Sequence, residues 1–270
     1  MPLLKKLGRD QRKRNRRIKK YSMKTVSLNI AGRSNFGKDF DERMRSIAKF
    51  LDEQQADIVC MQEVTFNGVE SLANRINNYM EKSYPHVLAQ MSEKYTFDKF
   101  TNRFMEKWKA GLIEHDGDYA TDGMSILSKE PIKNSSSIIM KPAPVSVNGK
   151  PDVRVRLTQM IELESGLTLA NVHFATNDNA YMQLQELMEY DYHSDIIVGD
   201  FNIHTKVLMG HKDIWGSDYT ESTEFKDYVS FPDENATFDH MLLRKSKYVF
   251  SNVEQFDGLS DHSAMIYTIE

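Results

Sequence analysis

The sequence predicts an α/β protein, and three features of the 270-residue chain indicate this. Short apolar runs with strand character alternate with amphipathic helical segments. Several of these strands end in a polar side chain, which is typical of a site at the carboxyl edge of a sheet. A hydrophobic content of 40% is enough for a substantial core. We therefore expect residues 25–270 to form one large domain.

Three helices are predicted from apolar residues at helical spacing. Residues 39–52 place Phe40, Met44, Ile47, Phe50 and Leu51 on one stripe. The same periodicity predicts helices over residues 69–79 and 180–190. No internal repeat and no low-complexity segment interrupts the pattern.

Short apolar or alternating runs bounded by polar residues predict the strands. In chain order they cover residues 25–29, 57–63, 124–127, 137–140, 153–163, 167–173, 196–202, 236–243 and 264–269. Polar residues in these strands or next to their ends form a candidate set: Asn29, Glu63, His173, Asp200, Asn202, Asp239, Asp261 and His262. Oxygen-rich sets with few imidazoles and no thiolate suit a hard cation such as Mg²⁺.

The first 24 residues form a basic arm, with eleven Lys and Arg against one acid, Asp10. The remaining 246 residues carry 24 basic and 38 acidic side chains, so the body is acidic. Such an arm suits a nucleic-acid backbone or an anionic membrane surface, and a disordered solvated extension is the alternative. Met23 stands just before the first strand and is an alternative start of the functional protein.

An insertion is predicted at residues 95–112, where Phe97, Phe100, Phe104 and Trp108 fall on one helical face. This stripe is interpreted as a packing face. The alternative is a lip beside the site that supplies stacking or lipid contact, and positive charge directed at phosphate.

Cellular location is inferred from what the sequence contains. No apolar region follows the basic start, and no run approaches the length of a membrane span. The single cysteine, Cys60, lies in an apolar strand and is expected in the core. A soluble cytoplasmic protein is therefore expected, and no obligate protein partner is implied.

The polar strand ends also carry a resemblance. In order, Leu28-Asn29, Gln62-Glu63, Val172-His173, the sequence GDFN at 199–202, FDH at 238–240 and SDH at 260–262 resemble the endonuclease/exonuclease/phosphatase superfamily, the DNase I-like phosphoesterases. The resemblance covers residues 25–270. It implies a four-layer α/β sandwich of two packed mixed β-sheets flanked by helices, and metal-dependent hydrolysis of phosphoesters.

The resemblance implies a metal site for Mg²⁺, with Mn²⁺ as an alternative. Glu63 is the first candidate ligand, because a carboxylate that ends a buried strand is costly without a compensating charge. Asn29 is expected to support the same ion, directly or through water. Asp261 completes the oxygen ligands by resemblance.

Catalytic roles follow from the same resemblance. Asp200 matches the position that orients or deprotonates the attacking water, and Asn202 the position that holds a phosphate oxygen; an Asx turn is the structural alternative for both. His262 matches the histidine that contacts the scissile phosphate, with Asp239 as its orienting partner. His240, on the other face of that strand, is interpreted as structural.

His173 distinguishes branches of the superfamily. Branches that resemble DNase I, sphingomyelinases and deadenylases place a histidine here that can act as the leaving-group acid, whereas the abasic-site endonuclease branch does not. Asp122, in an Asp-Gly pair before a strand, is the candidate partner of His173; a simple turn is the alternative. Ala180 replaces an arginine found in many relatives, and Arg154 or Arg156 are candidate substitutes.

Three functions remain open at this point. The favoured one is a nuclease that hydrolyses phosphodiester bonds in DNA or RNA. The second is a phosphatase or phospholipase C-type hydrolase acting on inositol phosphates or lipid headgroups, with the arm at the membrane. The third, a non-catalytic binding relative, is disfavoured because every expected catalytic position is present.

Overall fold

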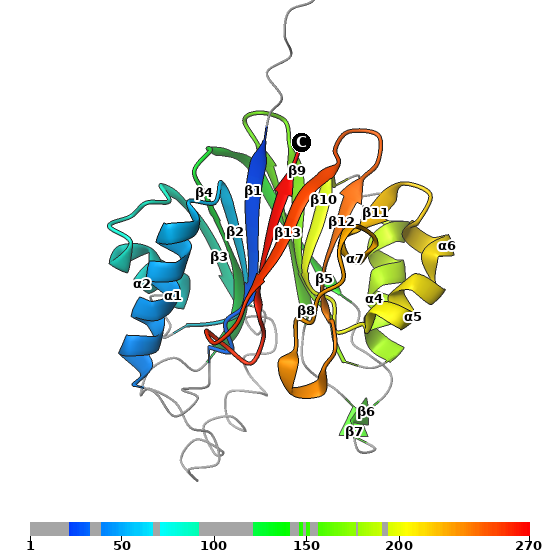
Figure 1. Ribbon diagram of the computed structural model, residues 1–270, viewed down its shortest axis with the longest axis horizontal. Coiled ribbons are helices and arrows are strands. Elements are labelled where there is room, and N and C mark those ends of the chain that lie inside the picture. Colours follow the sequence, from blue (N-terminus) through cyan, green and yellow to red (C-terminus); the bar gives the residue numbers. More distant parts are fainter. Residues whose placement is uncertain are drawn as a thin grey trace, which may run out of the picture.

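Two β-sheets pack face to face in the computed structural model, and helices cover the outer side of each sheet (Figure 1). The structure describes residues 22–32, 39–66, 71–91, 121–140, 146–147, 150–151, 156–176, 178–190 and 194–270. This arrangement confirms the predicted four-layer α/β sandwich.

The first sheet consists of β1 (Met23–Asn29), β2 (Ile58–Phe66), β3 (His86–Met91), β4 (Thr121–Ser128), β13 (Phe250–Phe256) and β14 (Ala264–Ile269). Their order is β13-β14-β1-β2-β4-β3. β1 runs parallel to β2 and antiparallel to β14, so the sheet is mixed. Helices α1 (Phe40–Gln54) and α2 (Leu72–Tyr79) cover its outer face.

The second sheet consists of β5 (Ile132–Met140), β8 (Arg156–Leu163), β9 (Thr168–His173), β10 (Ile196–Asp200), β11 (Tyr219–Glu221) and β12 (Asp239–Arg244). Their order is β11-β12-β10-β9-β8-β5, and β9 runs parallel to β10. Helices α4 (Asp178–Glu189), α5 (Thr205–Gly210) and α6 (Lys212–Trp215) lie on the outer side. The short elements that remain are α7 (Ser222–Phe225), the 3-10 helix η2 (Pro232–Glu234) and the hairpin of β6 (Ser146–Val147) with β7 (Lys150–Pro151).

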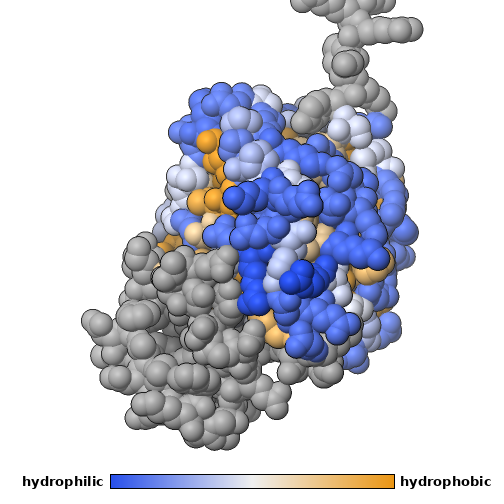
Figure 2. Space-filling model, turned by 90° about the vertical axis from the view of Figure 1, so that its left-hand side faces the viewer, coloured by the Kyte–Doolittle hydropathy of each residue, from blue (hydrophilic) through white to orange (hydrophobic). Residues whose placement is uncertain are grey.

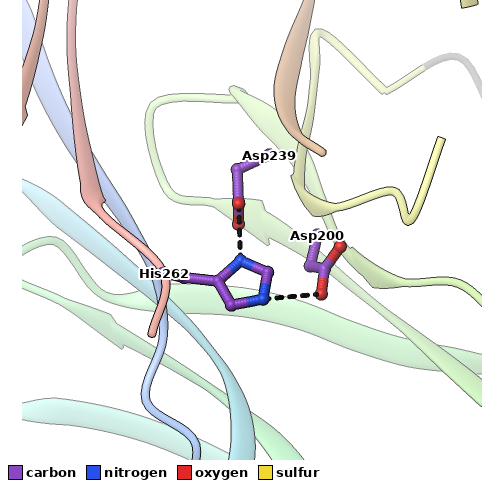
Figure 3. Close-up of side chains that lie close together, drawn as sticks. All are labelled: Asp200, Asp239 and His262. Carbon is purple, nitrogen blue, oxygen red and sulfur yellow. Dashed lines mark hydrogen bonds and ion pairs between the residues drawn. The ribbon is translucent and has the colours of Figure 1, made fainter. Parts of the chain in front are cut away.

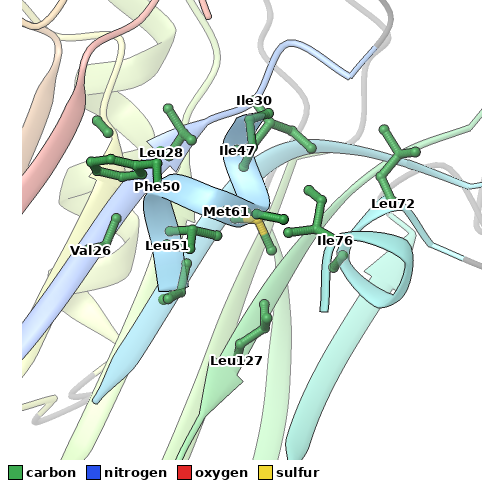
Figure 4. Close-up of a cluster of buried hydrophobic side chains, with 14 of the residues drawn as sticks. Val26, Leu28, Ile30, Ile47, Phe50, Leu51, Met61, Leu72, Ile76 and Leu127 are labelled. Carbon is green, nitrogen blue, oxygen red and sulfur yellow. The ribbon is translucent and has the colours of Figure 1, made fainter. Parts of the chain in front are cut away.

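Strands of the two sheets are buried on both faces, because helices cover one side of each sheet and the other sheet covers the second side. Successive side chains point to opposite sides of a sheet, so neighbouring residues enter different clusters. Val59 packs toward α1 and α2, whereas its neighbour Cys60 packs between the two sheets. Figure 4 shows the outer cluster, in which Ile47 of α1 and Ile76 of α2 pack over Met61 of β2. The expected core position of Cys60 is confirmed.

Helix α1 shows how local sequence sets these layers. The Asp39 side chain caps its first turn by accepting a hydrogen bond from the Glu42 amide at 3.0 Å. Met44 and Ile47 are fully buried, as the apolar stripe predicts. The helix ends where Gln55 adopts a left-handed conformation with φ of 50°. The surface on the α1 and α2 side is mainly hydrophilic (Figure 2).

Several boundaries differ from the sequence predictions. β1 begins at Met23, inside the segment assigned to the basic arm. Strands β3, β6, β7, β11 and β13 were not expected. In β13 only Phe250 and Val253 are buried, so its apolar pattern is sparse. The arm up to residue 21 and the aromatic stripe at 95–112 lie outside the described residues. Among described helices, none is long and apolar enough to cross a membrane.

Candidate active site

The predicted site residues converge where strands of both sheets end. Asn29 is the last residue of β1, His173 of β9 and Asp200 of β10. β9 and β10 are parallel neighbours with His173 opposite Asp200, and Asp239 is opposite Asp200 on β12. Residues far apart in the sequence therefore meet because the ends of adjacent strands coincide.

A buried carboxylate–imidazole–carboxylate arrangement lies at the centre of the site (Figure 3). His262 Nδ1 lies 2.7 Å from Asp239 Oδ2, and His262 Nε2 lies 3.9 Å from Asp200 Oδ2. Both aspartates are 1% exposed and His262 is 8% exposed. The predicted pairing of Asp239 with His262 is thus present in the structure.

These neighbours change the acidity of both groups. Burial raises the pKa of Asp200 to about 6, and this outweighs the attraction of His262. Burial opposes the charge of His262, but the carboxylates of Asp239 and Asp200 outweigh burial and raise its pKa to about 10. Near neutral pH His262 is therefore an imidazolium and Asp200 is ionised.

Asn29 joins the two sheets through its side-chain amide. Its Nδ2 donates to Asp200 Oδ2 at 3.1 Å and to Glu63 Oε1 at 3.3 Å. His173 Nε2 lies 3.6 Å from Asp200 Oδ2 and 3.8 Å from Glu63 Oε1. The carboxylates of Glu63 and Asp200, one from each sheet, therefore both lie beside the amide of Asn29 and the ring of His173.

Two site residues adopt unusual backbone conformations. Glu63 has φ of 52° and lies in a register shift of β2 between Met61 and Val64. Asn202 has φ of 50°, and its amide N–H donates to Asp200 Oδ1 at 2.8 Å. The Asx turn that was the structural alternative for Asp200 and Asn202 is thus present. Both residues nevertheless lie in the candidate site. Left-handed residues and bulges are frequent at functional sites.

Asp261 is held by its own loop. Its Oδ1 accepts hydrogen bonds from Ser260 Oγ at 2.8 Å and from the His262 amide at 3.1 Å. Among the described residues, the group of three possible metal ligands whose ligand atoms lie within 4.8 Å of one another is Asp200, Asp239 and His262, and it does not include Asp261. A ligand role for Asp261 stays a prediction.

A guanidinium lies beside His173. Arg156 on β8 is 8% exposed, and its Nη1 lies 3.0 Å from each ring nitrogen of His173. Arg156 is one of the two candidates for the missing helix arginine, and the other, Arg154, lies outside the described residues. The side chain of Asp122, the candidate partner of His173, also lies outside them; its backbone is in β4.

A pocket of about 560 Å³ opens next to His262 and was not predicted from the sequence. Its wall includes Asn202 and several rings: Tyr181, His204, His211, Phe231, Phe238 and His262. The Phe231 ring lies 4.9 Å from the His262 ring, measured between centroids. The pocket therefore combines a charged imidazole with planar apolar surfaces.

Comparisons with known proteins agree with this geometry. The pattern of the endonuclease/exonuclease/phosphatase family matches residues 26–262. No curated protein sequence matches the chain. Similar solved structures include an endonuclease/exonuclease/phosphatase from Bacteroides vulgatus, with 15% identity, a TM-score of 0.68, and coverage of 93% of this chain and 99% of that one.

Two further solved structures share the fold. The human Nocturnin catalytic domain with bound sulfate has 15% identity and a TM-score of 0.65, covering 92% of this chain and 94% of that one. Sphingomyelinase C from Streptomyces griseocarneus has 14% identity and a TM-score of 0.58, covering 92% of this chain and 99% of that one. At such identities these two likenesses establish the fold alone.

Proposed function

Because the chain belongs to the endonuclease/exonuclease/phosphatase family, a family of phosphoesterases, we propose that it is a Mg²⁺-dependent nuclease that hydrolyses phosphodiester bonds in DNA or RNA. The observation that carries the chemistry is the buried group of Asp200, His262 and Asp239. It supplies a base and a cationic hydrogen-bond donor at one place, as phosphodiester hydrolysis requires.

The residues divide the work by their protonation states. With a pKa of about 6, Asp200 is ionised at neutral pH and can accept a proton from the attacking water. His262 donates one ring N–H to Asp239, so Nε2–H remains for a phosphate oxygen. Asn202 is assigned to hold a second phosphate oxygen, and His173 to protonate the leaving oxygen.

The donor set fits a hard divalent cation. Glu63 and Asn29 would hold Mg²⁺, with Asp261 as the further predicted ligand; Mn²⁺ is the alternative. Two carboxylates, Glu63 and Asp200, converge on the amide of Asn29, and this concentration of negative charge favours a cation. When bound, the ion would neutralise charge on the phosphate and acidify water.

The pocket beside His262 favours nucleic acid over a lipid headgroup. Its rings, among them Phe231, Phe238 and Tyr181, offer flat surfaces within reach of the imidazole. Base–aromatic stacking contributes about 1–3 kcal/mol per base and tolerates any sequence. A nucleobase next to the scissile phosphate would fill such a pocket.

The proposal is tested by Mg²⁺-dependent hydrolysis with the wild type beside Asp200→Ala. The substrates are plasmid DNA, single-stranded RNA, sphingomyelin vesicles and a panel of phosphoinositides. We expect loss of DNA or RNA with the wild type only, and the cut pattern separates endonuclease from exonuclease action. Turnover of lipid without turnover of nucleic acid would instead establish the second function. If the wild type hydrolyses none of these substrates, the proposal is contradicted.

The basic arm gives a separate prediction. Deleting residues 1–22 removes ten of its eleven cationic side chains and leaves Met23 as the start. The salt dependence of DNA binding should flatten, because each phosphate contact contributes a slope of about −0.9. Turnover of a small phosphodiester should not change. Filter binding from low to high salt measures this, and an unchanged slope would mean that the arm does not contact nucleic acid.

A further inference from the structure

A buried ion pair lies behind the active site and has no part in the chemistry described above. His240 of β12 and Glu221, the last residue of β11, both have fully buried side chains. His240 Nδ1 lies 2.9 Å from Glu221 Oε1. On the other side of the ring, Nε2 lies 2.9 Å from the carbonyl oxygen of Ile203. His240 therefore links the edge strand β11 to the loop that follows β10.

The partners of His240 determine its protonation. A carboxylate and a carbonyl oxygen only accept hydrogen bonds, so both ring nitrogens donate and the ring is an imidazolium. Burial opposes this charge, but Glu221, the Ile203 carbonyl and Asp239 together outweigh burial and raise the pKa of His240. The reciprocal attraction lowers the pKa of Glu221 against the opposing effect of burial.

Glu221 is itself held firmly. Its Oε1 accepts a hydrogen bond from Ser222 Oγ at 2.8 Å, and its Oε2 accepts one from the Thr223 amide at 2.8 Å. The Thr223 contact caps the start of α7, and the Glu221 amide donates in return to Glu224 Oε1 at 3.2 Å, which is part of a capping box. The ring of Phe201 packs edge-on against His240 at 5.5 Å between centroids. Helix α7 and the ring of Phe201 therefore fix the position of the His240 imidazole.

The loop that His240 contacts carries a site residue. Ile203 directly follows Asn202, which has a left-handed backbone. Upstream, the Phe201 amide donates to the Phe238 carbonyl at 2.9 Å, and the Asn202 side chain donates to the Phe174 carbonyl at 2.9 Å. The contact of His240 with the Ile203 carbonyl fixes the next peptide along.

We propose that His240 is a positioning residue for the loop at residues 201–204: its Nε2–H bond to the Ile203 carbonyl holds Asn202 where it meets substrate. This rests on the proposed function, because it assigns a consequence to the placement of Asn202. His240 itself does not touch the reacting atoms, and it acts only through the loop.

Two substitutions separate the two contacts of the ring. The amide nitrogen of glutamine reaches the place of Nε2, so His240→Gln can keep the bond to Ile203 and lose the one to Glu221. The amide nitrogen of asparagine reaches the place of Nδ1, so His240→Asn can keep Glu221 and lose Ile203. Each variant gives up the charge and one hydrogen bond, which makes them matched controls for a purely structural effect.

We expect His240→Asn to raise KM for a small phosphodiester about tenfold, the effect of one lost positioning hydrogen bond. Amide exchange in residues 201–206 should also become faster. His240→Gln should keep KM within about threefold and retain the protection of that segment. Equal changes in KM and in exchange for the two variants would overturn the proposal, because a structural role alone predicts the same loss.

Amide exchange needs no activity, so the loop can be tested even if the wild type fails to hydrolyse phosphodiesters, which would contradict the proposed function instead. A nitrogen-15 spectrum of the wild-type imidazoles provides a test that does not depend on folding of a variant. It should show protons on both ring nitrogens of His240 near neutral pH. An unprotonated Nε2 would overturn the proposed bond to Ile203.

Discussion

Replacing Asp200 with asparagine should lower the turnover of phosphodiesters about 10³-fold and at the same time stabilise the folded protein. Turnover falls because asparagine cannot take a proton from water. Its shape still provides an oxygen for the Asn202 amide, which Asp200 Oδ1 accepts at 2.8 Å in the wild type. The rate should therefore fall while the loop that carries Asn202 keeps its conformation.

The stabilisation follows from the raised pKa of Asp200. The carboxyl has an ordinary pKa of 3.8 and one of about 6 in the folded protein. A protonated Asp200 contributes stability that is fully present below about pH 3.8 and is lost as the pH rises through about 6. Two units correspond to about 3 kcal/mol at about pH 8, and asparagine recovers part of this, because its amide group loses the hydrogen bond that Asp200 Oδ2 accepts from Asn29.

Thermal unfolding with EDTA present, beside steady-state kinetics with Mg²⁺, measures both effects of Asp200→Asn. We expect a melting temperature several degrees above that of the wild type. Near-normal turnover would remove Asp200 from the mechanism. A lower melting temperature at about pH 8 would show that attraction to His262 outweighs the burial of the carboxylate.

Changing the His262–Asp239 pair should have the second large effect. His262→Gln should lower turnover by about 10²–10⁴-fold, because glutamine carries no charge toward the phosphate. In the wild type, activity should rise with pH as Asp200 ionises near pH 6 and fall as His262 loses its proton near pH 10. The two pKa values thus predict a broad plateau of activity between these limits.

Asp239→Asn tests the cause of the upper limit. Removing the carboxylate bonded at 2.7 Å should lower the pKa of His262, so the falling limb should move to lower pH by at least about one unit. The lower limit near pH 6 should move little or downward, because Asp239 also raises the pKa of Asp200. His86→Gln, on β3 outside the site, is the matched control. An unmoved falling limb would contradict His262 as the donor.

The order of motifs predicted much of the fold and of the site. The helices at 39–52, 69–79 and 180–190 correspond to α1, α2 and α4. Asn29, Glu63 and Asp200 were selected because each ends or follows an apolar strand. In the structure the side-chain amide of Asn29 donates hydrogen bonds to both carboxylates. Strand periodicity is a local property, so residues close in sequence are sufficient to detect it.

Other features depend on pairings that the sequence does not display. The turned backbone at Glu63 arises from a register shift between β2 and β4, and the aromatic pocket unites helix α4 at Tyr181 with loops around residues 204 and 231. His240 was interpreted only as structural. Its ion pair was not predicted, because its partner Glu221 lies on a strand that has three residues and little apolar pattern. Contacts between distant segments follow from strand order and register.

Local sequence thus decided which side chains stand at the strand ends, because a strand alternates its faces and stops at polar residues. Tertiary structure decided their chemistry. Burial raises the pKa of Asp200. Burial opposes the charge of His262, but Asp239 on β12 and Asp200 on β10 lie close enough to raise its pKa. Charge interactions depend on distance and on exclusion of water, and both are set when the two sheets pack together.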